Sequence, residues 1–142
     1  MKTRMKRFLN VFLGLLMIAT QVFTTIPAVL AADTGVPDLV VTDISWSPAD
    51  PKMGDAVTFS ATIKNQGTGS TSAGIINGVS FFVDDTQVSW SDSNTRSIAP
   101  GESITVTANG GPNSSVWNAT KGSHTVTAWV DDVDRIKESN ED

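Results

Sequence analysis

The 142-residue chain contains no cysteine and no tyrosine, and it has a single histidine, His124. Without cysteine there is no disulfide, no thiolate metal site and no thiol nucleophile. A serine triad would need His124 as its base, and no strained strand–serine–helix turn is there to present the nucleophile. We therefore interpret His124 as a surface residue at the start of a strand, and we expect no enzyme activity and no catalytic residues.

Basic residues are scarce outside the N-terminal segment. All 15 acidic residues lie from Asp33 onward, whereas four of the 10 Lys and Arg residues precede it. Six bases against 15 acids give residues 33–142 a formal charge of −9. This charge disfavours nucleic acid as a partner, and it also disfavours simple electrostatic binding to anionic lipid or acidic polysaccharide.

Residues 1–32 have the features of a cleavable signal peptide. A start rich in Lys and Arg precedes an apolar run over residues 8–23, and Val29 and Ala31 occupy the two positions that a signal peptidase reads. The run is shorter and more interrupted than a membrane-spanning helix, which needs about 20 apolar residues. We predict export, no membrane association after cleavage, and a short linker at residues 33–37.

Short runs of alternating apolar and polar residues follow, with turn residues between them. AVTFSATIKN (residues 56–65) places Val, Phe, Ala and Ile on one face and mainly Thr and Ser on the other, which is the period of a half-buried strand. The same reasoning predicts strands within residues 39–47, 76–85, 87–94, 103–109 and 124–132, and an edge strand around Ile136 in RIKES. About seven short strands and no helical stripe predict an all-β, two-sheet sandwich.

Four tryptophans are the candidate ligand-binding residues, because an exposed indole can stack on the apolar face of a sugar ring. Trp129 is expected to face solvent, since its strand neighbours take the core face. Trp90 is expected to share a face with Val88 on an edge strand, and Trp117 lies in an irregular segment. These three are the candidates for glycan stacking, whereas the spacing of Trp46 places it in the core. A single tryptophan is more often a packing residue, but two exposed on one sheet would favour glycan binding.

Acidic side chains cluster near the C-terminus and could supply the oxygen ligands that calcium prefers. Asp131, Asp132 and Asp134 are the candidate calcium ligands. Their spacing does not match an EF-hand loop, and the alternative is an acidic turn whose Asp side chains bond their own backbone. We expect no other cofactor.

An ordered set of short motifs resembles one known family. These motifs are PDLVV at the start, GD before the second strand, NQGT after it, PG at residues 100–101, and the closing IKESNE. Together, over residues 37–142, they resemble the CARDB domain, the cell-adhesion-related domain found in bacteria. The resemblance implies an immunoglobulin-like or fibronectin-III-like sandwich over residues 38–142 with no catalytic residues.

The resemblance also implies a setting. Such modules are repeated in bacterial surface proteins and attached to secreted polysaccharide-degrading enzymes, and they usually continue past ESNE. We therefore expect a domain truncated at its C-terminus that belongs to a longer multidomain chain.

Two functions are predicted from these observations. The first is a secreted, non-catalytic module, extracellular or at the cell surface, for adhesion or accessory carbohydrate binding, with a polysaccharide or a cell-surface protein as its partner. The alternative is a structural spacer, with or without calcium, that positions a further domain. A patch containing Trp129 and Trp90 would favour the first, and buried indoles would favour the spacer.

Overall fold

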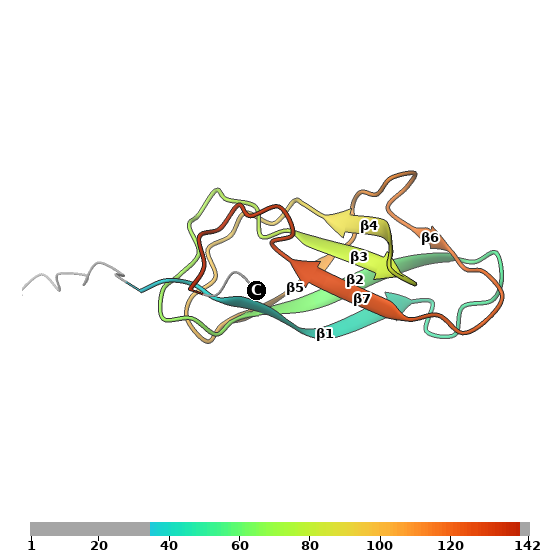
Figure 1. Ribbon diagram of the computed structural model, residues 1–142, viewed down its shortest axis with the longest axis horizontal. Coiled ribbons are helices and arrows are strands. Elements are labelled where there is room, and N and C mark those ends of the chain that lie inside the picture. The colour runs from blue at the N-terminus through green and yellow to red at the C-terminus, as the bar shows by residue number, and fades with distance from the viewer. Residues whose placement is uncertain (1–34, 140–142) are drawn as a thin grey trace, which may run out of the picture. The chain divides into compact units, whose positions relative to one another are not determined.

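The computed structural model describes residues 35–139 as an all-β domain (Figure 1), so the predicted signal peptide and residues 140–142 lie outside the described residues. Its seven strands are β1 (Leu39–Ser47), β2 (Ala56–Asn65), β3 (Val79–Val83), β4 (Thr86–Ser91), β5 (Ser103–Thr107), β6 (Trp117–Asn118) and β7 (Val126–Val130). One sheet has the order β1-β2-β5, with β6 paired to β2, and the other has the order β4-β3-β7. All pairs are antiparallel. Within the described range the chain forms no helix that could span a bilayer. The predicted two-sheet sandwich is confirmed.

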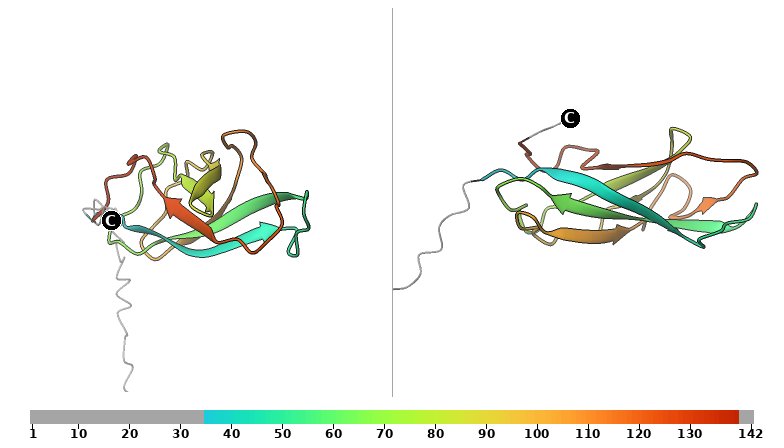
Figure 2. Two further views of the ribbon diagram at one scale, coloured as in Figure 1. Left: turned by 45° about the vertical axis from the view of Figure 1, so that its right-hand side comes forward. Right: turned by 90° about the horizontal axis from the view of Figure 1, so that it is seen from below.

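The core lies between the two sheets, and the alternation within the strands determines which residues enter it. The rings of Phe59 on β2 and Phe81 on β3 stack with their centroids 5.8 Å apart, and each side chain is at most 1% exposed. Two views of the ribbon show the sheets as separate layers, with β1, β2 and β5 forming the face seen from below (Figure 2). The predicted core positions of β2, β3 and β5 are buried: Val57, Ala61, Ile63, Val79, Val83, Ile104, Val106 and Ala108.

Strand β1 contains a bulge that changes which residues face the core. Val41 pairs with Ile63 and Asp43 pairs with Thr62, so Thr42 is an extra residue in the ladder. An extra residue reverses the alternation for the rest of a strand. Trp46 pairs with Phe59 of β2, so it is on the core-facing side of the sheet. Its side chain is nevertheless 43% exposed, because it lies at the end of the sandwich. The prediction that Trp46 is a core residue was therefore wrong.

A second bulge shapes the hairpin of β3 and β4. Asp84 and Asp85 form its two-residue turn, both with positive φ, as a type I′ turn requires. Along β4 the register shifts at Val88, which packs against the core. Trp90 pairs with the outward-facing Ser80 instead. Val88 and Trp90 therefore do not share a face, contrary to the prediction, although β4 is an edge strand as expected.

The predicted edge strand around Ile136 does not form within the described residues. Asp131 ends β7, and its carboxylate accepts hydrogen bonds from the backbone N–H groups of Arg135 and Ile136 at 3.0 and 2.8 Å. These bonds hold the segment in a compact turn and bury Ile136, which is 6% exposed. The seven observed strands instead include the two-residue β6, which lies in a stretch that was expected to be irregular.

Candidate functional site

The outer faces of the two sheets differ in chemistry. On the β1-β2-β5 sheet, hydroxyls pair across the strands, with Ser60 to Thr107 at 2.9 Å and Thr62 to Thr105 at 3.3 Å. On the β4-β3-β7 sheet, the outward positions carry large aromatic side chains. The outer face of the β4-β3-β7 sheet is therefore the better candidate for ligand binding.

Two indoles flank one serine on this aromatic face. Ser80 of β3 pairs with Trp90 of β4 on one side and with Trp129 of β7 on the other. Trp129 is 65% exposed, as its strand alternation predicted, and its ring lies 5.5 Å from that of Phe82. Because neighbouring strands are about 5 Å apart, the backbones of the two tryptophans are about 10 Å apart.

Trp90 is held in place by a glycine that comes close to its ring. The backbone N–H of Trp90 donates to the carbonyl of Gly110 at 2.8 Å, and the N–H of Gly110 donates back at 3.1 Å. A Cβ atom at position 110 would lie 2.3 Å from Nε1 of Trp90, so the indole packs directly against the glycine backbone. Gly110 lies in a segment that the sequence identified only as irregular.

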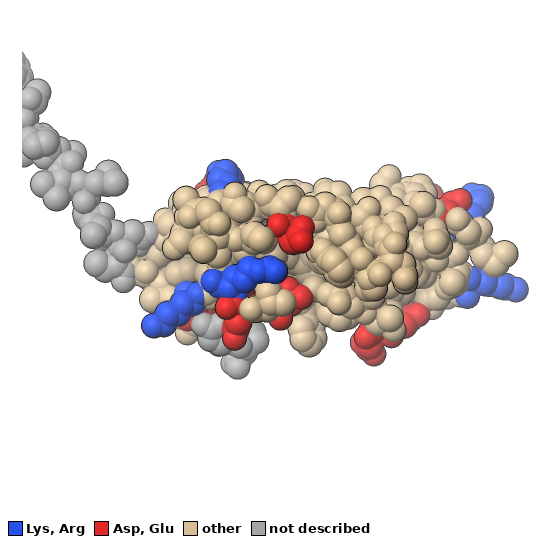
Figure 3. Space-filling model, turned by 90° about the horizontal axis from the view of Figure 1, so that it is seen from above, with Lys and Arg blue, Asp and Glu red and all other residues tan. Residues whose placement is uncertain are grey.

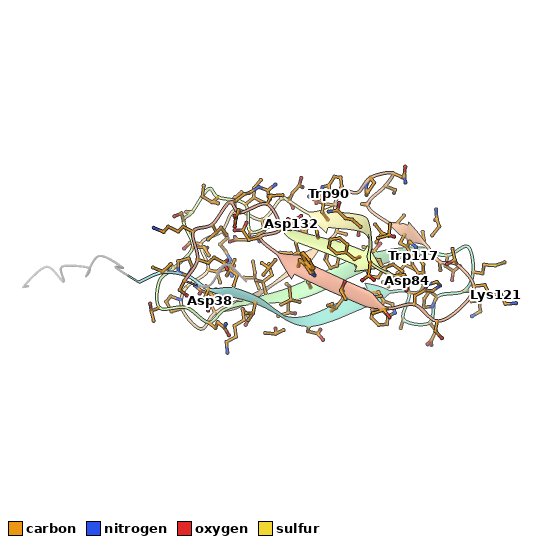
Figure 4. The ribbon with its side chains drawn as sticks, viewed as in Figure 1. Asp38, Asp84, Trp90, Trp117, Lys121 and Asp132 are labelled. Atoms are coloured by element: carbon orange, nitrogen blue, oxygen red, sulfur yellow. The ribbon has the colours of Figure 1, made fainter. Side chains whose placement is uncertain are left out.

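Beside Trp90 the surface is hollowed over a volume of about 280 Å³. Ser80 lies at its base, 1% exposed, where its Oγ donates to the Oδ2 of Asp132 and accepts from the Nε2 of Gln87 at 2.7 Å. Trp90 and Asp132 lie close to this sheet in Figure 4. The full lining is Ser80, Gln87, Trp90, Ser91, Asp92, Asp132, Val133 and Arg135. An aromatic wall next to several hydrogen-bonding groups can receive a small polar ligand with an apolar face.

Charge is sparse on this side of the molecule. The space-filling view from above shows a surface that is largely uncharged, with a few acidic and basic groups set into it (Figure 3). A ligand bound there would meet a mainly uncharged surface, and the charged groups of the hollow beside Trp90 are Asp92, Asp132 and Arg135.

Trp117 lies apart from the other two candidate tryptophans. Its ring is half-buried, 6.4 Å from Phe59 of the core and 5.0 Å from His124 in an edge-on arrangement. The structure thus brings Trp90 and Trp129 to one face and places Trp117 against the core, at the end of the sandwich labelled with Asp84 in Figure 4.

His124 precedes β7 and bridges two loops. Its Nδ1 lies 2.7 Å from the Oδ2 of Asp84, and its Nε2 lies 3.1 Å from the hydroxyl of Thr120. The other oxygen of Asp84 accepts from the backbone N–H of Thr125 at 3.0 Å. The hydrogen bond to Asp84 raises the pKa of His124 above its ordinary value of 6.5, and the same bond lowers the pKa of Asp84.

We expect Asp84→Asn to return the pKa of His124 toward 6.5, because the main group that stabilises the imidazolium loses its charge. Asn tolerates the positive φ of this turn position. NMR titration of the ring protons measures this directly, since the chain has one histidine. A raised folded-state pKa stabilises the fold fully below pH 6.5 and loses this contribution as the pH rises through the folded value. The pH dependence should weaken in Asp84→Asn and persist in Asp85→Asn, and an unchanged His124 pKa in Asp84→Asn would contradict the assignment.

The three candidate calcium ligands have separate roles in the turn after β7. Asp131 caps the backbone of the following residues, Asp132 accepts from Ser80, and Asp134 adopts a positive φ. Within residues 35–139 no three acidic or histidine side chains are grouped in a way that could hold a metal ion. Calcium binding stays a prediction, and the observed geometry assigns Asp132 to the hollow beside Trp90.

Comparison with family models identifies the class of this domain. The CARDB family model matches residues 36–142, so the chain belongs to the CARDB family. These domains are non-catalytic and occur in bacterial extracellular proteins. No curated protein and no solved structure matches the chain.

Proposed function

We propose that this CARDB domain binds carbohydrate through the outer face of the β4-β3-β7 sheet. The observation that carries the proposal is the placement of Trp90 and Trp129 on either side of Ser80, next to a polar hollow. Both indoles are on the outer face of the sheet; Trp129 is 65% exposed and Trp90 is half-buried. Exposed aromatic surface of this kind favours association and is therefore costly without a ligand. The presence of both indoles is explained by a ligand with flat apolar faces.

The chemistry of a sugar ring matches that of the hollow. The C–H face of a pyranose can lie on the indole of Trp90, while its hydroxyls can donate to Asp132 and accept from Gln87 and Arg135. A volume of about 280 Å³ is at the small end for ligand pockets and suits about one sugar ring. Further rings of the same chain would then lie over the sheet toward Trp129.

The setting supports the same role. CARDB domains occur in bacterial extracellular proteins, and the signal peptide predicted at residues 1–32 would deliver this one outside the cell or to its surface. The acidic charge would repel highly charged polysaccharides, so the glycan is largely neutral. The module would attach the protein that carries it to a polysaccharide or a glycan-coated surface.

Titration of the full chain with cellohexaose, xylohexaose and mannohexaose, followed by tryptophan emission, tests the proposal. We expect a saturable blue shift with at least one of them. Trp90→Ala should weaken binding at least about tenfold, equivalent to about 1.4 kcal/mol. Trp46→Ala is the matched control, since this indole is exposed but belongs to the other sheet.

A variant that leaves all tryptophans in place provides a further test. Gly110→Ala should displace the Trp90 ring and weaken binding while circular dichroism shows an intact fold. If no sugar changed the tryptophan emission of the folded protein, or if Trp90→Ala and Trp46→Ala lost the same affinity, the proposal would be refuted. The spacer role would then be the favoured function.

A further inference from the structure

A second hollow has a volume of about 340 Å³ and shares one lining residue with the hollow beside Trp90. The shared residue is Arg135, whose side chain borders both hollows. A Cβ at Gly78, the residue before β3, would lie 2.7 Å from one terminal nitrogen of Arg135. Because glycine has no side chain, the guanidinium can pack against the backbone at this position. The lining of the second hollow is Gly35, Val36, Pro37, Ser70, Ser72, Ile75, Arg135, Ile136 and Lys137.

The second hollow is basic, although the domain is acidic. Among the described residues that line it, the charged ones are Arg135 and Lys137. Across residues 35–139, the ion pairs within 4.0 Å are Arg96 with Glu102 and His124 with Asp84, so neither Arg135 nor Lys137 is neutralised by a carboxylate of the described chain. Two cations that have no described carboxylate within 4.0 Å line this concave surface, and they favour an anionic ligand group there.

We propose that the glycan continues from the hollow beside Trp90 past Arg135 into the second hollow, and that the sugar bound there is a uronic acid. This inference rests on the proposed carbohydrate-binding function. The carboxylate of the uronic acid pairs with the guanidinium of Arg135 and the ammonium of Lys137.

The remaining lining fits the rest of such a sugar. Val36, Pro37 and Ile75 offer apolar surface to the ring, and Val36 and Ile75 are 36% and 38% exposed. The guanidinium of Arg135 can hold a carboxylate through two parallel hydrogen bonds, which a neutral sugar cannot match.

The charge of the domain limits how many acids the glycan carries. The formal charge of −9 over residues 33–142 repels a chain with an acid on every ring. Asp132, which lines the hollow beside Trp90, disfavours a second carboxylate on that side of Arg135. The fitting ligand is therefore a mainly neutral chain with occasional uronic acids.

Three hexasaccharides test the inference on the full chain: xylohexaose, xylohexaose bearing one glucuronic acid, and the carboxyl-reduced form of the latter. We expect the acidic ligand to bind at least about fivefold tighter than its reduced form, with the gain lost at high salt because the contact is ionic. Arg135→Gln and Lys137→Gln should each reduce this gain and leave the affinity for xylohexaose nearly unchanged. Lys64→Gln, on the outer face of the other sheet, is the control and should retain the gain.

The outcomes separate this inference from the proposed function. Equal affinity for the acidic and reduced ligands, with both weakened by Trp90→Ala, would overturn the inference and support the proposed function. Undiminished binding of the acidic ligand by Trp90→Ala would overturn the continuity between the two hollows. Absence of binding to all three ligands, and to the neutral hexasaccharides of other composition, would overturn both proposals.

Discussion

Replacing Phe81 with alanine is expected to lower the free energy of unfolding by about 3–5 kcal/mol. Phe81 is fully buried, and its ring stacks on Phe59 of the opposite sheet with a centroid distance of 5.8 Å. Its removal leaves a cavity where the sheets meet, and the paired strands on each side cannot close it without breaking ladder hydrogen bonds. A domain of this size is stable by about 5–15 kcal/mol, so the variant loses a large share of the total.

The neighbouring Phe82 is the matched control, because it lies on the same strand and has the same chemistry but points outward. Its half-buried ring contacts Trp129 at 5.5 Å. Urea unfolding, followed by circular dichroism, should show that Phe82→Ala costs less than half as much as Phe81→Ala. Equal costs for the two variants would contradict the assignment of faces along β3.

Strand positions and most of the core could be predicted from the sequence, because a sandwich strand must alternate to bury one face. The bounds of β1 and β2 match the predicted segments, and the core positions of β2 are all at most 1% exposed. The error of facing at Trp90 comes from the bulge at Val88, whereas Trp46 lies on the core-facing side of β1 and is exposed because it is at the end of the sandwich. A bulge adds one residue to one strand of a pair, and this depends on the partner strand, which local periodicity does not show.

The candidate site could be predicted only in part for a related reason. The exposure of Trp129 follows from the alternation of its own strand, without knowledge of any partner. The support of Trp90 depends on Gly110, and the polar base of the hollow depends on a bond between Ser80 and Asp132, which are 52 residues apart. Such contacts depend on which strands are neighbours in the sheet, and this order cannot be read from a short stretch of sequence.

The same limit applies to Asp132, one of the three candidate calcium ligands, whose contact with Ser80 could not be predicted from the sequence. In the sequence it stands between two other acids, which suggests shared ligation. In the structure each of the three Asp residues has its own local role, and Asp132 accepts a hydrogen bond from Ser80 of the neighbouring strand β3. Adjacent acids in a turn therefore gave the correct local conformation, an acidic turn, and no information on which of them faces the hollow.

Asn65→Ala is expected to cost about 3–5 kcal/mol, because several hydrogen bonds lose one partner in a place that water does not reach. Asn65 is fully buried. Its Nδ2 donates to the carbonyls of Gly69 and Ile98 at 2.7 and 2.9 Å, and its Oδ1 accepts from the N–H groups of Asp38 and Gly67 at 3.1 and 3.0 Å. These four bonds use the full capacity of an amide side chain. They tie the start of β1, the loop after β2 and the segment before β5 together.

Asn109→Ala is the comparison, since Asn109 is exposed and its side chain accepts one bond, from the N–H of Asp92 at 3.0 Å. Its loss should cost less than about 1 kcal/mol. Asn65→Ala should also increase hydrogen exchange in the loop from Gly67 to Thr71, because the amide no longer fixes it, and that loop leads into the lining of the second hollow. Binding of the uronic acid ligand would then weaken more than binding of xylohexaose. An Asn65→Ala domain as stable as Asn109→Ala, with an unchanged exchange pattern, would show that the buried amide does not hold these segments together.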